Sequence, residues 1–93
     1  MTYTITVGSE ASADLNAIYN YIKEQDSTSK AKNFIFELQH SINTLETMPF
    51  RCRTSIYNND ETVRDLIYKG YTIVFKVSEQ HVHILSIFRQ KSL

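Results

Sequence analysis

The amino-acid sequence predicts one α+β domain that spans residues 1–93, with the element order β-α-α-β-β-β. Three observations lead to this prediction. Polar and apolar residues alternate at the N-terminus, two helical stripes of apolar residues follow, and three stretches rich in β-branched and aromatic residues lie beyond Pro49. Because two successive helices form an αα-hairpin, we expect a mostly antiparallel sheet with this hairpin packed on one face.

Residues 1–7 are expected to form the first strand, because threonines alternate there with apolar side chains. The pair Gly8-Ser9 supplies a turn, and the Ser9 hydroxyl is a candidate cap for a helix with Glu10 in its first turn. One stripe of this helix is apolar and should face the core. It consists of Ala11, Leu15, Ile18, Tyr19 and Ile22.

A polar connection at residues 25–29 precedes a second amphipathic helix. Pro49 ends the helical region, because proline has no amide proton to donate, and it favours an extended conformation at Met48. Residues 49–61 are then expected to be a loop. The apolar stripe of the second helix consists of Ala31, Phe34, Ile35, Leu38, Ile42 and Leu45.

The last third of the chain has the composition of strands. Residues 63–68, 71–77 and 82–89 are rich in β-branched and aromatic side chains. Lys69-Gly70 indicates a tight hairpin between the first two stretches, and residues 78–81 indicate a longer polar turn before the third.

Composition narrows the class of protein. Apolar residues make up 42% and charged residues 22% of the 93 residues, which is typical of a globular domain and not of a disordered chain. Cys52 is the single cysteine, so the chain cannot form an internal disulfide or a thiolate metal site of its own. We expect no signal peptide, no membrane span and a cytoplasmic location.

The zero net charge hides an asymmetry between the two halves. Residues 1–50 contain three lysines and six carboxylates, a net charge of −3, whereas residues 51–93 contain seven cations and four carboxylates, a net charge of +3. The basic half could meet an acidic partner or a phosphate backbone, and it could equally be ordinary surface.

The ordered set of residues resembles the RelE/ParE superfamily of bacterial toxins, closer to the ParE-like branch. In the first helix the resemblance lies in Asp14-Leu15, Ile18 and Tyr21-Ile22. In the second helix and its exit it lies in Ala31, Phe34, Leu38, Ile42, Leu45 and Pro49. In the last strands it lies in Val63-Arg64, Leu66, Tyr71, Ile73, Phe75, Val77, Val82, Ile84-Leu85, Ile87 and Arg89.

This resemblance implies the toxin of a type II toxin-antitoxin system, with a cognate antitoxin as partner and no cofactor. One branch of the superfamily cleaves messenger RNA on the ribosome without a metal, and the ParE branch poisons DNA gyrase by binding. We expect the second activity, and hence no enzyme. An RNA-cleaving toxin and a non-toxic relative that only binds antitoxin remain the alternatives, and the oligomeric state, a homodimer or a heterotetramer with the antitoxin, stays open.

Two departures from the RNA-cleaving relatives weaken the nuclease interpretation, and they also make the chain an imperfect match to typical ParE strands. Thr72 stands where ribosome-dependent cleavers have an arginine, and Phe88 stands where many relatives have a histidine. For target binding we expect Arg64, Arg89 and Lys91, because arginine holds phosphate or carboxylate through a bidentate fork. In a nuclease the candidates would be Arg64, Arg89 and Tyr71. The alternative for both arginines is a purely structural role, in which each forms an ion pair with a carboxylate on the protein surface.

For the antitoxin we expect contacts along the helical hairpin, at Leu15, Ile18, Ile22, Phe34 and Leu38.

His81 and His83 share one face of a strand but lack a third ligand at suitable spacing, so we expect no metal site and two solvated residues. Cys52 lies between two arginines, which would lower its pKa if it were exposed, yet with no base nearby we expect a passive thiol. No structural role is predicted for Tyr57.

Overall fold

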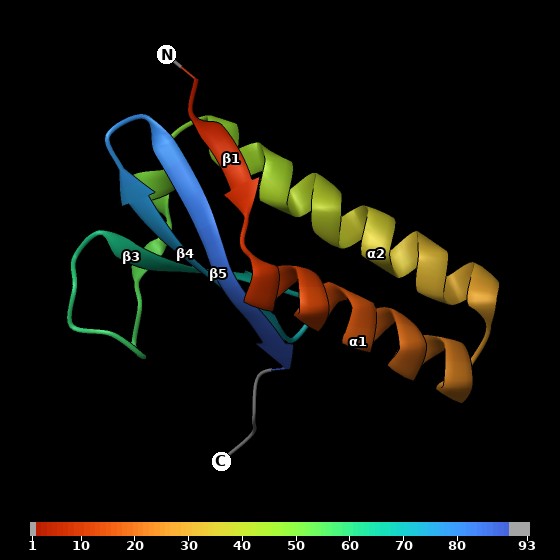
Figure 1. Ribbon diagram of the computed structural model, residues 1–93. Helices are drawn as coiled ribbons and strands as arrows, with labels where there is room; N and C mark the ends of the chain where they lie inside the picture. Colours follow the sequence, from red (N-terminus) through yellow and green to blue (C-terminus); the bar gives the residue numbers. More distant parts are fainter. Residues whose placement is uncertain (1, 90–93) are drawn as a thin grey trace.

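The computed structural model describes residues 2–89 and confirms the α+β class (Figure 1). The elements are β1 Thr4–Val7, α1 Ser9–Gln25, α2 Thr28–Asn43, two 3₁₀ turns at Thr44–Glu46 and Pro49–Arg51, β2 Arg53–Thr54, β3 Val63–Tyr68, β4 Tyr71–Ser78 and β5 His81–Arg89. They form one five-stranded sheet in the order β1-β5-β4-β3-β2. The pair β1 and β5 is parallel and the other neighbours are antiparallel.

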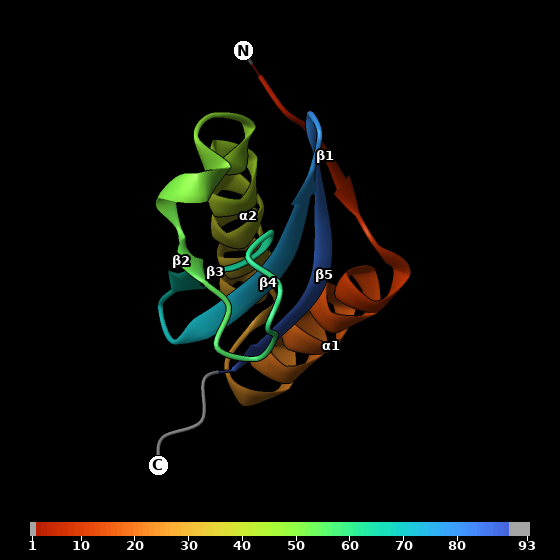
Figure 2. The ribbon, with the colours of Figure 1, turned by 90° about the vertical axis from the view of Figure 1, so that its left-hand side faces the viewer.

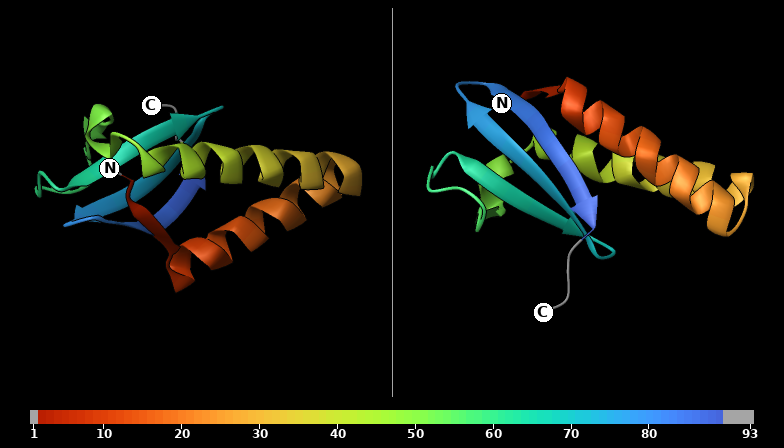
Figure 3. Two further views of the ribbon diagram at one scale, coloured as in Figure 1. Left: turned by 90° about the horizontal axis from the view of Figure 1, so that it is seen from above. Right: turned by 60° about the horizontal axis from the view of Figure 1, so that its bottom comes forward.

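The helical hairpin packs on one face of the sheet, as expected. Figures 1 and 3 show the two helices side by side, with their connected ends projecting beyond the strands. Neither helix of the described chain is long and apolar enough to cross a membrane. The core joins side chains from both helices to the sheet face that carries Ile73, Phe75, Val77, Val82, Ile84 and Ile87. Apolar burial between these layers is the main stabilising term.

The junction between β1 and α1 lies against the main chain of β5. The Gly8 amide donates to the Ile84 carbonyl at 3.0 Å, and a Cβ at position 8 would lie 3.0 Å from the same oxygen, so a side chain would crowd this approach. In the second turn of the helix, the Asp14 carboxylate accepts a hydrogen bond of 2.9 Å from the Ile87 amide. Asp14 therefore satisfies an amide of β5 beyond the end of β1.

Two expectations about helix ends are corrected. Gly8, not Ser9, is the N-cap of α1, and no side-chain hydrogen bond caps this end, because Ser9 already lies inside the first turn. The connection to α2 is two residues long, since α1 ends at Gln25 and α2 begins at Thr28. At the start of α2, the Ser27 hydroxyl accepts a hydrogen bond from the Lys30 amide at 3.1 Å.

The segment 49–61, expected to be a loop, contains a 3₁₀ turn and the short strand β2, which pairs with β3. This strand is two residues long, so it has no alternation that a sequence pattern could reveal. Met48 is also not extended, because its φ of 50° lies in the left-handed region. Arg51 donates to the carbonyls of Thr47 and Met48, at 3.2 Å and 3.3 Å, and holds this turn.

After β2 the chain covers the second face of the sheet (Figure 2). The ring of Tyr57 meets the ring of Phe88 edge-on, with centroids 5.1 Å apart, which is a structural role for Tyr57 that the sequence did not predict. Asp65 has a fully buried side chain, and its Oδ2 accepts from the Ile56 amide and the Arg53 guanidinium, each at 3.3 Å. The segment is thus held against Asp65 of β3 and against Phe88 near the end of β5.

The two hairpin turns agree with the predicted positions. Lys69 and Gly70 have φ angles of 45° and 83°. Positive φ at both central residues is typical of the two-residue turns that join the strands of a β-hairpin. The turn between β4 and β5 is shorter than expected, because the strands reach Ser78 and His81 and leave two residues between them.

Candidate functional site

A shallow pocket lies between α1, the start of β4 and the end of β5. Its volume is about 270 Å³, and its lining consists of Ala17, Ile18, Tyr21, Tyr71 and Arg89. The first three belong to α1, Tyr71 opens β4, and Arg89 ends β5. Because Tyr71 and Arg89 are direct partners in the β4–β5 ladder, the pairing of these two strands fixes them side by side.

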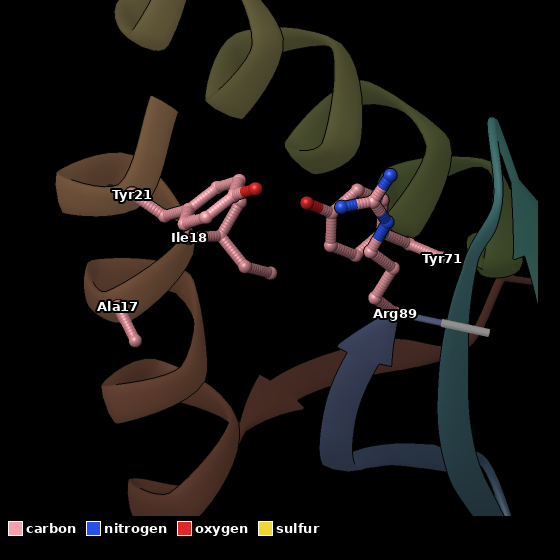
Figure 4. Close-up of a pocket in the computed structure, with 5 residues that line it drawn as sticks. All are labelled: Ala17, Ile18, Tyr21, Tyr71 and Arg89. Carbon is pink, nitrogen blue, oxygen red and sulfur yellow. The ribbon is translucent and has the colours of Figure 1, made fainter. Parts of the chain in front are cut away.

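The side chains of this pocket face one another across an open space (Figure 4). Tyr21 and Ile18 project from α1 on one side, and the Tyr71 ring lies beside the Arg89 side chain on the other. The Tyr71 ring also packs on Phe34 of α2, with centroids 5.3 Å apart. The pocket is therefore an apolar hollow with one cation and two phenol groups at its rim.

Arg89 is the one arginine of residues 2–89 whose guanidinium makes no hydrogen bond or ion pair in the structure. The residue is exposed. Among residues 2–89 no acidic side chain pairs with Arg89, so its charge is available to a ligand. A free guanidinium can bind a carboxylate or a phosphate with two parallel hydrogen bonds.

Arg64 has a different environment, because it is bonded to the protein's own main chain. Its guanidinium donates to the carbonyls of Glu61 at 2.8 Å, Phe50 at 3.3 Å and Cys52 at 3.0 Å. It also lies 4.9 Å from the centroid of the Phe50 ring. Arg64 thus holds the segment before β2 against β3, and it pairs with carbonyl groups instead of the surface acid considered from the sequence.

The two arginines do not lie on adjacent strands, as β4 separates β3 from β5. In the ladders Arg64 is opposite Phe75, and Arg89 is opposite Tyr71. Four residues along β4 correspond to roughly 13 Å, and two strand spacings add roughly 10 Å across the sheet. The structure therefore brings Tyr71 to Arg89 but leaves Arg64 outside their site.

The other titratable candidates are also remote from the pocket. His81 and His83 stack with ring centroids 4.5 Å apart at the start of β5, and His81 is 2.6 Å from the Thr6 hydroxyl. Six residues of strand put His83 roughly 20 Å from Arg89. Residues 2–89 contain no cluster of three side chains that could ligate a metal. Cys52 is buried, and burial raises the pKa of its thiol, opposite to the effect expected for an exposed cysteine.

The residues expected to bind an antitoxin lie on the side of the hairpin that covers the sheet. Leu38 has no exposed surface and Ile18 is 8% exposed, so both serve the protein's own core in this conformation. Leu15, Ile22 and Phe34 are partly buried and pack against the same core. The last expected target contact, Lys91, lies outside the described residues.

Sequence reasoning missed the contribution of Tyr21 to the pocket. In the sequence Tyr21 stands out only through the family resemblance, whereas in the structure it is 49% exposed and lines the pocket. A usable signal was present, because Tyr21 is one position off the apolar stripe and Ala17, one turn earlier, leaves room beside it.

Comparison with known proteins places the chain in a family. The family model described as ParE toxin of type II toxin-antitoxin system, parDE, matches residues 5–93. The chain belongs to the ParE toxin family. This confirms the resemblance inferred from the order of motifs. No curated protein matches the sequence at a significant level.

Solved structures show that this ParE-family chain shares its fold with toxin-antitoxin proteins. A chain of the chromosomal ParDE system from P. aeruginosa matches with a TM-score of 0.83 and 21% identity, over 97% of this chain and 98% of that one. A chain of the toxin-antitoxin complex RelBE2 from Mycobacterium tuberculosis matches with a TM-score of 0.72 and 13% identity, over 97% and 93% of the two chains.

Proposed function

We propose that this ParE-family protein is a growth-inhibiting toxin that binds DNA gyrase, acts without cleaving RNA, and is neutralised by a cognate antitoxin. Family membership over residues 5–93 supports the toxin assignment. The structural neighbours from P. aeruginosa and M. tuberculosis, named as a ParDE system and a RelBE2 complex, support an antitoxin as partner.

The observation that carries the choice of mechanism is the dispersal of the candidate catalytic residues. Metal-independent RNA cleavage needs a base, an acid and cations within reach of one phosphate. Arg64 is bonded to three carbonyls and lies on a different strand from Arg89, beyond β4. Thr72 has no exposed surface, so the position that carries an arginine in RNA-cleaving relatives presents nothing to a ligand here.

Binding to gyrase would use the exposed and unbonded Arg89, and Lys91 beyond it in the sequence. A binding surface distributes its energy over a few side chains, and each strong contact contributes about 2 kcal/mol or more. Arg89→Ala should therefore weaken inhibition by a graded amount and leave some activity at high toxin concentration. The pairing of Tyr71 with Arg89 keeps the nuclease alternative testable, because these two groups do share one site.

The test compares both activities with purified protein. The protein should inhibit supercoiling by gyrase or trap its cleaved DNA complex, and it should leave messenger RNA intact on translating ribosomes. Lys23→Gln is a suitable control, since Lys23 is an exposed cation near the end of α1 that does not line the pocket. Codon-spaced cuts in messenger RNA that Arg89→Ala abolishes, with gyrase unaffected, would establish the nuclease instead.

The antitoxin part of the proposal is tested by expression in bacteria. The chain alone should slow growth, and co-expression of the protein encoded next to it should restore growth. Strong soluble expression with healthy growth and no partner would support the non-toxic relative. For the antitoxin contact, the proposed residues remain Leu15, Ile18, Ile22, Phe34 and Leu38. Leu15, Ile22 and Phe34 are partly exposed and Ile18 is 8% exposed, whereas Leu38 would require the hairpin to move.

A further inference from the structure

The pocket bounded by α1 and the ends of β4 and β5 has a composition that suits one kind of ligand group. Its floor is apolar, formed by Ala17, Ile18 and the aromatic rings, and its rim carries the guanidinium of Arg89. Figure 4 shows the hydroxyls of Tyr21 and Tyr71 directed toward the space between the helix and the strands. A group with an anionic head and an apolar stem would match both parts.

The polar groups at the rim are the Arg89 guanidinium and the hydroxyls of Tyr21 and Tyr71. Within residues 2–89 neither phenol hydroxyl has a hydrogen-bond partner, and Arg89 makes no bond to the protein. The other three described arginines, Arg51, Arg53 and Arg64, are all bonded to their own chain. A guanidinium and two phenol hydroxyls can all donate to an anion, and charge-assisted hydrogen bonds of this kind are stronger than neutral ones.

The size of the pocket points to a single side chain. Its volume of about 270 Å³ is below the roughly 300–1,000 Å³ of pockets that enclose whole small-molecule ligands. An Asp or Glu side chain on a longer segment fits this description, because its methylene groups would contact the apolar floor and its neighbours in sequence would cover the rim.

The surrounding charge favours a polypeptide over a nucleic acid. The α1 residues that line the pocket, Ala17, Ile18 and Tyr21, carry no charge, so this wall adds no cation that could hold a chain of phosphates. Nucleic-acid sites gather several cations along one surface, whereas Arg89 is the one charged residue that lines this pocket. A single carboxylate needs only one cation.

We propose that this pocket anchors an acidic side chain, flanked by apolar residues, from the polypeptide that neutralises the toxin. The inference rests on the proposed function for the identity of the partner. Binding of a carboxylate by Arg89, Tyr21 and Tyr71 can be measured without any antitoxin or gyrase. Failure of the site and failure of the toxin assignment are therefore distinguishable.

The experiment uses three capped tripeptides, acetyl-Leu-Glu-Leu-amide and its Gln and Lys counterparts, titrated into the ¹⁵N-labelled full chain. Chemical shifts of the Ala17, Ile18 and Tyr71 amides report on occupancy. The Glu peptide should bind about tenfold more tightly than the Gln peptide, because a hydrogen bond to a charged group is worth more than one between neutral groups. Added salt should reduce this difference, since the pocket is open to solvent.

Three variants separate the site from general charge effects. Arg89→Gln should bring the ratio between the Glu and Gln peptides close to one, and Tyr21→Phe, which keeps the ring, should reduce it several-fold. Lys23→Gln removes the same charge from α1 away from the pocket and should leave the ratio unchanged. Unaltered amide spectra elsewhere in each variant would show that the fold is intact.

Two outcomes would overturn the proposal. Equal binding of the Glu and Gln peptides by the unmodified protein would show that the pocket has no preference for a carboxylate. Shifts of the same amides by a short oligoribonucleotide at lower concentration than by the Glu peptide would assign the site to nucleic acid. Retained growth inhibition in either case would leave the toxin assignment standing.

Discussion

Thr72→Val should raise the stability of the folded domain. Thr72 lies in β4 with no exposed surface, and its hydroxyl has no hydrogen-bond partner in the structure. A buried hydroxyl without a partner costs about 1–3 kcal/mol relative to its hydrated state. Valine replaces the hydroxyl with a methyl group of similar size and is also favoured in strands. We expect a gain of about 1 kcal/mol, or roughly 4–8 °C in Tm for a domain of this length.

Thermal and urea unfolding followed by circular dichroism would measure this gain. Thr4→Val is the matched control, because Thr4 is an exposed strand residue and its change should stay within about 0.5 kcal/mol. A loss of stability in Thr72→Val would refute the reasoning and show that the hydroxyl has a partner. The Oδ1 atom of Asp65, which is buried without a partner on the same face of the sheet, would be the first candidate. The proposed inhibition of gyrase should survive the substitution.

Three further substitutions test the roles assigned to individual side chains. Asp14→Ala should lower the free energy of unfolding by about 1–3 kcal/mol in urea titrations, because the β5 amide that it binds would lose its acceptor. Arg64→Ala should lower Tm clearly, whereas Arg89→Ala should leave Tm unchanged and affect only binding. The hydrogen bond from Lys69 holds the pKa of Glu37 below its usual value. This contact therefore stabilises the fold above about pH 4.5, and the stabilisation is lost as the pH falls through the lowered pKa. Glu37→Gln should flatten that part of the curve of unfolding free energy against pH.

The helices were predictable because their signal is local. The sequence located the start of α1 to within one residue, and the apolar stripes of both helices contribute to the core on the sheet face. The strands β3, β4 and β5 were likewise located to within one residue by their β-branched composition. Periodicity depends only on neighbours along the chain, so it can be read without knowing the tertiary structure.

The features that escaped prediction all depend on residues distant in sequence. β2 exists only because Arg53 and Thr54 pair with β3, and two residues carry no periodicity of their own. Tyr57 obtained its role from contact with Phe88, thirty-one positions later. Tyr21 likewise belongs to a pocket only because Tyr71 and Arg89 lie opposite it, which the helical pattern does not encode.

The contrast between Arg64 and Arg89 shows why candidate sites are harder to predict than elements. Both were chosen for the same chemistry, a guanidinium at a strand position in the basic half of the chain. The path of residues 50–52 places two carbonyls beside Arg64, and their hydrogen bonds make it part of the fold. Nothing in residues 2–89 approaches Arg89 in that way, so its binding capacity is unused. Because an occupied guanidinium must first break its own hydrogen bonds, Arg89 is the better ligand-binding group although the two positions look alike in sequence.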